Sequence, residues 1–134
     1  MIAELKTKFD SVMIIDDNET DIYIASHIVM MNNFAKKIFE YSSSQEALKY
    51  LQDNQENINA LPEIIFLDIH MPVMNGFDFI EGYDKLSPVL KNHCKIYLVS
   101  STNNELDIAR IKADKNIVAF YEKPITKKNL ADIS

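Results

Sequence analysis

Ionisable and hydroxyl side chains follow several of the apolar runs in this sequence. The clearest case is Asp68, which ends the run "EIIFLD" (63–68) and precedes a proline turn that closes at Gly76. Burying a carboxylate costs free energy unless the group is paired or bound to a metal. Asp68 therefore needs chemical partners, and the ends of the other apolar runs carry side chains that could serve.

Those partners are two further carboxylates, a hydroxyl and an ammonium group: Asp16, Asp17, Ser100 and Lys123. Three carboxylates in one crevice repel each other, and their pKa values rise unless a cation is present. Oxygen-only ligands favour Mg²⁺. A lysine can pair with a carboxylate at rest and with a phosphoryl oxygen afterwards, and a serine hydroxyl can donate to another phosphoryl oxygen. Phosphoryl transfer needs these groups, because its catalysis is mostly positioning and charge neutralisation.

Five short apolar segments are expected to be strands that position these side chains. They are rich in Ile, Val, Phe and Tyr, and they are too continuous to have one wet face, as in parallel sheets covered by helices on both sides. The segments are 11–16, 36–41, 63–68, 95–100 and 117–122.

Amphipathic segments between these runs predict helices. Ser43 and Glu46 have the spacing of a capping box, and 54–62 is expected to be a polar loop. The alternation predicts a doubly wound α/β domain, in which ligands bind beyond the carboxyl ends of the strands. The predicted helices are 20–31, 42–53, about 76–86, 103–113 and 126–134.

Bulk composition excludes several classes of protein. The length of 134 residues and the 47% hydrophobic content predict one folded domain spanning 1–134, without an output domain. A net charge of −6 argues against general nucleic-acid binding. The two glycines, Gly76 and Gly82, are too few for a P-loop or a dinucleotide-binding loop.

The expected location is the cytoplasm. The single cysteine, Cys94, excludes a disulfide within the chain, and no apolar stretch approaches the roughly 18 residues of a membrane span. The first ten residues lack the features of a signal peptide.

Four segments together resemble the receiver domain of bacterial two-component response regulators. They are "IIDDNETD" (14–21), "FLDIHMPVMNG" (66–76), "LVSST" (98–102) and "FYEKP" (120–124), and the similarity runs over nearly the whole chain. The resemblance implies a flavodoxin-like, five-stranded parallel sheet with strand order 2-1-3-4-5.

The resemblance also implies a role for each matching residue. Asp68 corresponds to the phosphoacceptor, and Asp16, Asp17, Asp68 and the backbone carbonyl of His70 to the Mg²⁺ ligands. Ser100 corresponds to the hydroxyl that bonds the attached phosphoryl group, and Lys123 to the family's lysine. Phe120 matches the aromatic switch position, although its neighbour Tyr121 could be mistaken for it.

The implied function is a signalling switch rather than an enzyme acting on other substrates. Asp68 would accept a phosphoryl group from a phosphohistidine on a sensor histidine kinase or a histidine phosphotransfer protein, with Mg²⁺ as cofactor. The changed conformation would act on an unknown downstream protein, without direct contact to nucleic acid or membrane. The protein is expected to be a monomer or a weak, phosphorylation-dependent dimer.

Two alternatives stay open. A phosphatase of the haloacid-dehalogenase type also uses an Asp nucleophile with Mg²⁺, but it needs a second acid two residues later, where His70 stands. A degenerate receiver that is never phosphorylated would lack one of the acids or the lysine, and none is lacking. His27, His70 and His93 do not have the spacing of a helical metal site. Ser101 and "KADKN" (112–116) depart from the commoner family pattern.

Overall fold

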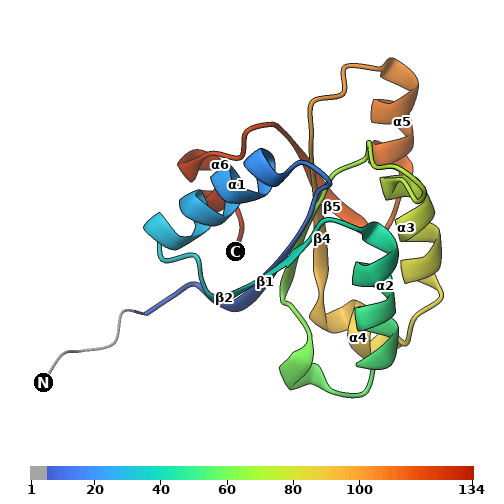
Figure 1. Ribbon diagram of the computed structural model, residues 1–134. Helices are drawn as coiled ribbons and strands as arrows, with labels where there is room; N and C mark the ends of the chain where they lie inside the picture. Colours follow the sequence, from blue (N-terminus) through green and yellow to red (C-terminus); the bar gives the residue numbers. More distant parts are fainter. Residues whose placement is uncertain (1–5) are drawn as a thin grey trace, which may run out of the picture.

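A parallel five-stranded sheet with helices on both faces forms the framework of the protein (Figure 1). The computed structural model describes residues 6–134. The sheet order is β2-β1-β3-β4-β5, and every neighbouring pair is parallel, so the predicted fold class and strand order are confirmed. The strands are β1 (Phe9–Ile15), β2 (Ala35–Tyr41), β3 (Ile64–Leu67), β4 (Lys95–Ser100) and β5 (Ile117–Glu122).

The helices divide between the two faces of the sheet. Helices α1 and α6 cover one face, and the other four helices lie on the opposite side (Figure 1). No helix within 6–134 is long and apolar enough to cross a membrane. The helices are α1 (Glu19–Met31), α2 (Ser44–Asp53), α3 (Gly76–Asp84), α4 (Pro88–His93), α5 (Glu105–Ala113) and α6 (Lys127–Ala131).

Side chains on each strand alternate between two hydrophobic clusters. Met13 and Ile15 of β1 belong to the cluster under α2, α3, α4 and α5, whereas Val12 and Ile14 belong to the cluster under α1 and α6. All four residues of β3 are buried, as expected for a central strand covered on both faces. The apolar runs of β1, β3 and β4 therefore mark strands that are covered on both faces, whereas the edge strands β2 and β5 are partly exposed.

The structure differs from the sequence-based expectation at several helices. Helix α4 was not predicted: the Ser87 side chain accepts a hydrogen bond from the backbone of Leu90, and Pro88 occupies the first turn. A short 3-10 helix (Ile58–Ala60) lies inside the segment expected to be a loop. The last helix is shorter than 126–134, because it ends at Ala131.

Capping at α2 is also simpler than predicted. The Ser43 side chain accepts a hydrogen bond from the backbone N–H of Glu46 at 3.2 Å. No return bond from the Glu46 side chain is present among the described residues, so Ser43 acts as a single N-cap rather than as half of a capping box. At α1 the N-cap is Asn18.

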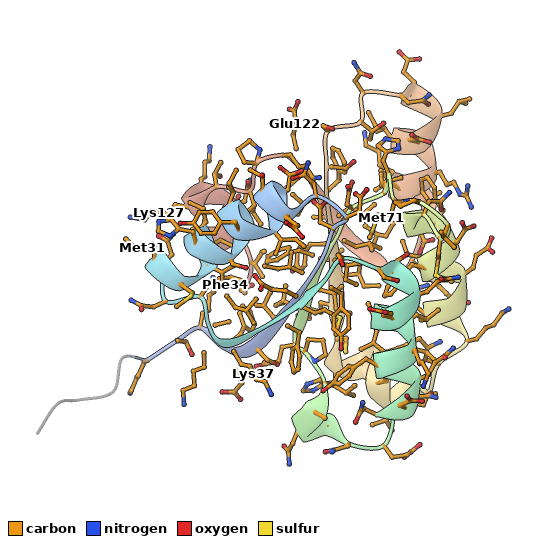
Figure 2. All side chains as sticks on the ribbon, viewed as in Figure 1. Met31, Phe34, Lys37, Met71, Glu122 and Lys127 are labelled. Atoms are coloured by element: carbon orange, nitrogen blue, oxygen red, sulfur yellow. The ribbon has the colours of Figure 1, made fainter. Side chains whose placement is uncertain are left out.

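The carboxyl ends of the strands gather at one edge of the sheet. Figure 2 labels Met71, shortly after β3, and Glu122, the last residue of β5, toward one end of the sheet, while Lys37 near the start of β2 lies toward the other. Parallel strands produce this arrangement, since all of them point the same way. The residues that follow β1, β3, β4 and β5 therefore share one edge.

Gly76 allows a close approach between the start of α3 and the end of β3. A Cβ atom built on Gly76 would lie 2.8 Å from Ile69 Cα and 2.9 Å from the Asp68 carbonyl oxygen, both of which are backbone atoms. On Gly82 the closest atom would be Leu48 Cδ2, at the tip of a flexible side chain. Only the first conflict requires the backbone to move.

We predict that Gly76→Ala lowers the free energy of unfolding by about 2 kcal/mol, because the backbone beside Asp68 must shift. Gly82→Ala should cost less, since a Leu48 rotamer change relieves the contact and alanine favours the helix. Urea denaturation of both variants measures the difference. An equal or smaller cost at Gly76 would contradict this account of the turn.

Candidate functional site

The ammonium group of Lys123 lies among three carboxylates at the carboxyl edge of the sheet. Its Nζ atom is 2.6 Å from Asp16 Oδ2, 2.9 Å from Asp21 Oδ2 and 3.1 Å from Asp68 Oδ2. Asp16 and Asp68 are 5% and 6% exposed, so their ion pairs with Lys123 are almost completely shielded from water. Residues that are far apart in the sequence thus meet at one cation.

Backbone hydrogen bonds beyond the ends of the strands hold these residues in place. The N–H of Asp16 donates to the Tyr41 carbonyl at 3.0 Å, and the N–H of Asp68 donates to the Ile15 carbonyl at 3.0 Å. The N–H of Lys123 donates to the Ser100 carbonyl at 3.1 Å. Each site residue is therefore tied to the neighbouring strand, and its side chain leaves a rigid backbone.

Burial and charge pairing act in opposite directions on the pKa values of the site. Burial raises the pKa of Asp16, and the hydrogen bonds from Lys123 and the Asn18 backbone only partly offset it. Burial alone lowers the pKa of Lys123, but its hydrogen bonds to Asp16 and Asp21 and the charge of Asp68 outweigh that effect and raise it above the ordinary value. Lys123 is therefore fully charged at neutral pH.

The acidic residues have a donor set that suits Mg²⁺. One carboxylate oxygen from each of Asp16, Asp17 and Asp68 lies within 4.8 Å of the others. Asp16 and Asp68 are buried, whereas Asp17 is exposed. Carboxylate oxygens around one point, with an exposed side where waters can remain, match the requirements of a hard divalent cation.

Ser100 places an unpartnered hydroxyl at the end of β4. The residue is 0% exposed, and its Oγ atom has no hydrogen-bond partner among residues 6–134. A buried hydroxyl without a partner costs free energy, so such groups call for a physical explanation. The hydroxyl is suited to bond an acceptor that reaches the site from outside the chain.

The turn after Asp68 donates a backbone hydrogen bond to its carboxylate. The N–H of His70 donates to Asp68 Oδ1 at 3.3 Å, and the His70 side chain is exposed. Met71 is buried, and the N–H of Gly76 donates to the Ile69 carbonyl at 2.8 Å, which closes the turn. The role predicted for the His70 carbonyl, as a metal ligand, stays a prediction.

The two aromatic residues before the lysine pack on opposite faces of the sheet. Phe120 packs against the cluster under α2, α3, α4 and α5, and pairs with Leu98 in the β4–β5 register. Tyr121 packs against the α1 and α6 side, where its ring stacks on Tyr97 with centroids 6.0 Å apart. Phe120 is half-buried, and its assignment as the switch residue stays a prediction.

Sequence reasoning missed Asp21, although it belongs to the quoted segment 14–21. It lies in the first turn of α1, and its backbone N–H is capped by the Asn18 side chain at 3.0 Å. A usable signal was present: α1 begins directly after the acidic pair, so its first turn must lie beside the carboxyl edge of the sheet. The predicted residues Asp16, Asp68 and Lys123 are in direct contact, and Asp17 joins the acidic cluster.

The family described as "Response regulator receiver domain" matches residues 12–133 of the chain. The chain belongs to this family. A two-component response regulator from Cytophaga hutchinsonii is a similar solved structure, with 28% identity, 92% of each chain covered and a TM-score of 0.84.

Two curated relatives are longer than this receiver domain. The chain is 26% identical over 108 residues to a protein-glutamate methylesterase/protein-glutamine glutaminase of Caldanaerobacter subterraneus, covering 77% of the chain and 28% of that protein. It is 24% identical over 131 residues to the autoinducer 1 sensor kinase/phosphatase LuxN of Vibrio harveyi, covering 98% of the chain and 14% of that protein. The chain thus spans less than a third of the length of either relative.

We predict that Ser100→Ala raises the free energy of unfolding by about 1 kcal/mol, because it removes a buried hydroxyl that has no partner. Chemical denaturation without phosphodonor measures the change. Ser101→Ala is the matched control, since Ser101 is exposed, and it should change stability by less than about 0.5 kcal/mol. A destabilised Ser100→Ala protein would show that the hydroxyl is satisfied in the resting state.

We predict that Asp16→Asn stabilises the metal-free protein by roughly 1 kcal/mol at neutral pH. Burial raises the pKa of Asp16 above the ordinary value of an aspartic acid. A group with a raised pKa favours folding when protonated, and that contribution is lost as the pH rises through the raised value. Asparagine is neutral throughout and avoids the loss.

Denaturation in a chelator tests this expectation, with Asp17→Asn as the exposed control that should change less. Saturating Mg²⁺ should cancel or reverse the advantage of Asp16→Asn, because a cation bound to the native state stabilises the wild type more. A less stable Asp16→Asn protein in chelator would contradict the prediction.

Proposed function

We propose that this receiver domain is a phosphorylatable switch in which Asp68 accepts a phosphoryl group from a phosphohistidine donor, with Mg²⁺ as cofactor. The observation that carries the proposal is the position of the Asp68 carboxylate. It is buried just after β3, beside the ammonium of Lys123 and close to the carboxylates of Asp16 and Asp17. A stabilising role alone would not call for so many acids at one edge of the sheet.

The transfer step uses the carboxylate of Asp68 as nucleophile. One of its oxygens forms a bond to phosphorus while the phosphorus–nitrogen bond of the donor breaks, and the electron pair of that bond leaves on the imidazole nitrogen. The Lys123 ammonium, 3.1 Å from Asp68 Oδ2, is close enough to neutralise charge that gathers on a phosphoryl oxygen. Hydrolysis of the acyl phosphate later returns the carboxylate.

Asp16, Asp17 and Asp68 are the residues that would hold Mg²⁺, together with the His70 carbonyl. The cation would supply charge neutralisation for a phosphoryl group beside three carboxylates. The residues of the chain do the rest of the positioning: the β1 and β3 ends fix the carboxylates, and the exposed side of Asp17 leaves room for solvent.

After transfer, Ser100 and Lys123 can contact the new group. Phosphorylated side chains carry about −1.5 to −2 charges, and the unpartnered Ser100 hydroxyl can donate to one phosphoryl oxygen. Contacts of this kind exist in only one arrangement of β4 and β5, so they shift an existing equilibrium. Phe120, on β5 two residues before its end, is proposed to rotate in that shift, with the response at the surface of α5, β5 and α6.

The partners proposed for this switch are a sensor histidine kinase or a histidine phosphotransfer protein as donor, and an unidentified protein as target. Similarity to a sensor kinase/phosphatase supports the donor class. The net charge of −6 supports a target other than nucleic acid. The free buried thiol of Cys94 supports a reducing cytoplasm. We propose a monomer or a weak dimer that forms on phosphorylation.

We predict that incubation with acetyl phosphate and Mg²⁺ adds one phosphoryl group to the protein, and that Asp68→Asn abolishes the addition. Intact mass spectrometry measures it. Asp10→Asn is the matched control, because Asp10 is an exposed acid at the start of β1, far along the strand from the site. A chelator should also prevent the addition.

Two outcomes would overturn the proposal. If the wild type gains no phosphoryl mass, the protein is a degenerate receiver. If it turns over a generic phosphate ester many times per molecule, the haloacid-dehalogenase alternative holds instead, even though the exposed His70 stands where that class needs an acid.

A further inference from the structure

We propose that Asp21 is a positioning residue that receives the Lys123 ammonium when Mg²⁺ occupies the acidic cluster. This inference rests on the proposed function, since it concerns the same site. Among residues 6–134, Asp21 is the one carboxylate bonded to Lys123 that does not belong to the cluster of Asp16, Asp17 and Asp68. It can therefore keep its bond to the lysine while the other acids turn to a metal.

Lys123 and a divalent cation would draw on the same two carboxylates, those of Asp16 and Asp68. In the structure the ammonium contacts Asp16 at 2.6 Å and Asp68 at 3.1 Å, and both residues offer oxygens to the acidic cluster. A cation bound to these carboxylates repels the ammonium and competes with it for their negative charge, so the contacts of Lys123 with Asp16 and Asp68 weaken. The Lys123 side chain is only 17% exposed, so an ammonium without a partner there would carry a large desolvation cost.

Asp21 offers the Lys123 ammonium a partner outside the metal cluster, in the cavity beside the site. A cavity of about 220 Å³ adjoins the site between the end of the sheet and α1. Its charged lining residues are Lys123, Asp16, Asp68 and Asp21, and its other lining residues are apolar. Within this cavity, Asp21 is thus the only carboxylate outside the metal cluster, and a lysine that moved elsewhere would meet side chains such as Ile24 and Ile125.

Asp21 can pair with the Lys123 ammonium without a large desolvation cost and from a fixed position. Its side chain is 36% exposed, compared with 8% for Asp16, so Asp21 stays partly hydrated whether or not the lysine turns fully toward it. It lies in a regular turn of α1 whose start is fixed by the Asn18 cap, so the position of the carboxylate is stable. Lys123 already lies 2.9 Å from it and need not travel.

Removing Asp21 should therefore weaken Mg²⁺ binding for two reasons that act in the same direction. The site loses a negative charge, and Lys123 is left with only Asp16 and Asp68 as partners, which makes it a stronger competitor of the cation. The first effect can be matched at Glu19, an exposed acid two residues away in the same helical turn, for which no ion pair is present among residues 6–134. The second effect is particular to Asp21.

Isothermal titration calorimetry of the full chain with MgCl₂ tests the proposal. Asp21→Asn should raise the Kd for Mg²⁺ about fivefold, while Glu19→Gln should raise it less than about twofold, since Asp21 contacts Lys123 directly and Glu19 acts only as a solvent-screened charge. Both variants lose the same charge from the first turn of α1, so helix-dipole effects cancel in the comparison. Equal changes in the two variants, or tighter binding by Asp21→Asn, would overturn the inference.

Two further variants separate positioning from a structural role. Asp21→Glu keeps a carboxylate within reach of Lys123, and we expect it to recover at least half of the lost affinity on a logarithmic scale. In a Lys123→Gln background there is no ammonium to receive, so Asp21→Asn should then change the Kd no more than Glu19→Gln does. A full fivefold effect in that background, or no recovery by Asp21→Glu, would contradict a role that acts through Lys123.

The wild-type titration distinguishes failure of this inference from failure of the proposed function. If the wild type binds no Mg²⁺ and gains no phosphoryl group, the proposed function itself is wrong. If the wild type does both, and Asp21→Asn matches Glu19→Gln, only the role of Asp21 is wrong.

Discussion

A single buried ammonium group balances the acids at the carboxyl edge of this sheet. Asp16 and Asp68 are nearly inaccessible to water, and each would repel the other if Lys123 were absent. Buried charges are tolerated only when they are paired and hydrogen-bonded. The ion pairs of Lys123 therefore allow three strands to end in charged residues at one place, and every function argued for this site depends on that tolerance.

The ion pairs of Lys123 leave two polar groups of the site without full compensation for their burial, which suits the proposed switch. Burial still raises the pKa of Asp16 despite the nearby lysine, and the Ser100 hydroxyl has no hydrogen-bond partner among residues 6–134. Both features cost stability in the resting protein. A cation and a phosphoryl group would relieve them, so the free energy that the fold gives up at rest is available to drive a change of arrangement.

Strand β5 packs against the hydrophobic clusters on both faces of the sheet, and it ends next to the site. Phe120 packs beneath the helices on one face and Tyr121 beneath α1 and α6 on the other, and Lys123 follows directly after the strand. The two faces of the sheet carry different features beside the site. The cavity beside Lys123 lies toward α1, where Asp21 is, whereas Phe120 packs against the cluster on the opposite face, to which Ile111 of α5 belongs.

Residue patterns alone predicted the five strands and the polar residues at their ends, and the resemblance to a known family supplied the strand order. Continuous apolar runs such as 63–68 are too short for typical buried helices and so indicate strands covered on both faces. Polar residues at the ends of parallel strands share an edge, so Asp68, Ser100 and Lys123 could be assigned to one crevice. Helix α4 was missed because a six-residue helix has too few turns to show a periodic pattern, although Ser87 and Pro88 signalled its start.

The ion pairs of the site could be identified only from the packing of the elements in three dimensions. Asp21 looked like an ordinary acid in the first turn of a helix, and its contact with Lys123 spans 102 positions in the sequence. The sequence likewise does not reveal that the Ser100 hydroxyl lacks a hydrogen-bond partner within the described part of the chain, or that Gly76 lies close to the Asp68 backbone. Residue patterns report which face or end of an element a side chain occupies. Distances of about 3 Å between atoms depend on how whole elements pack, and many packings are compatible with one local pattern.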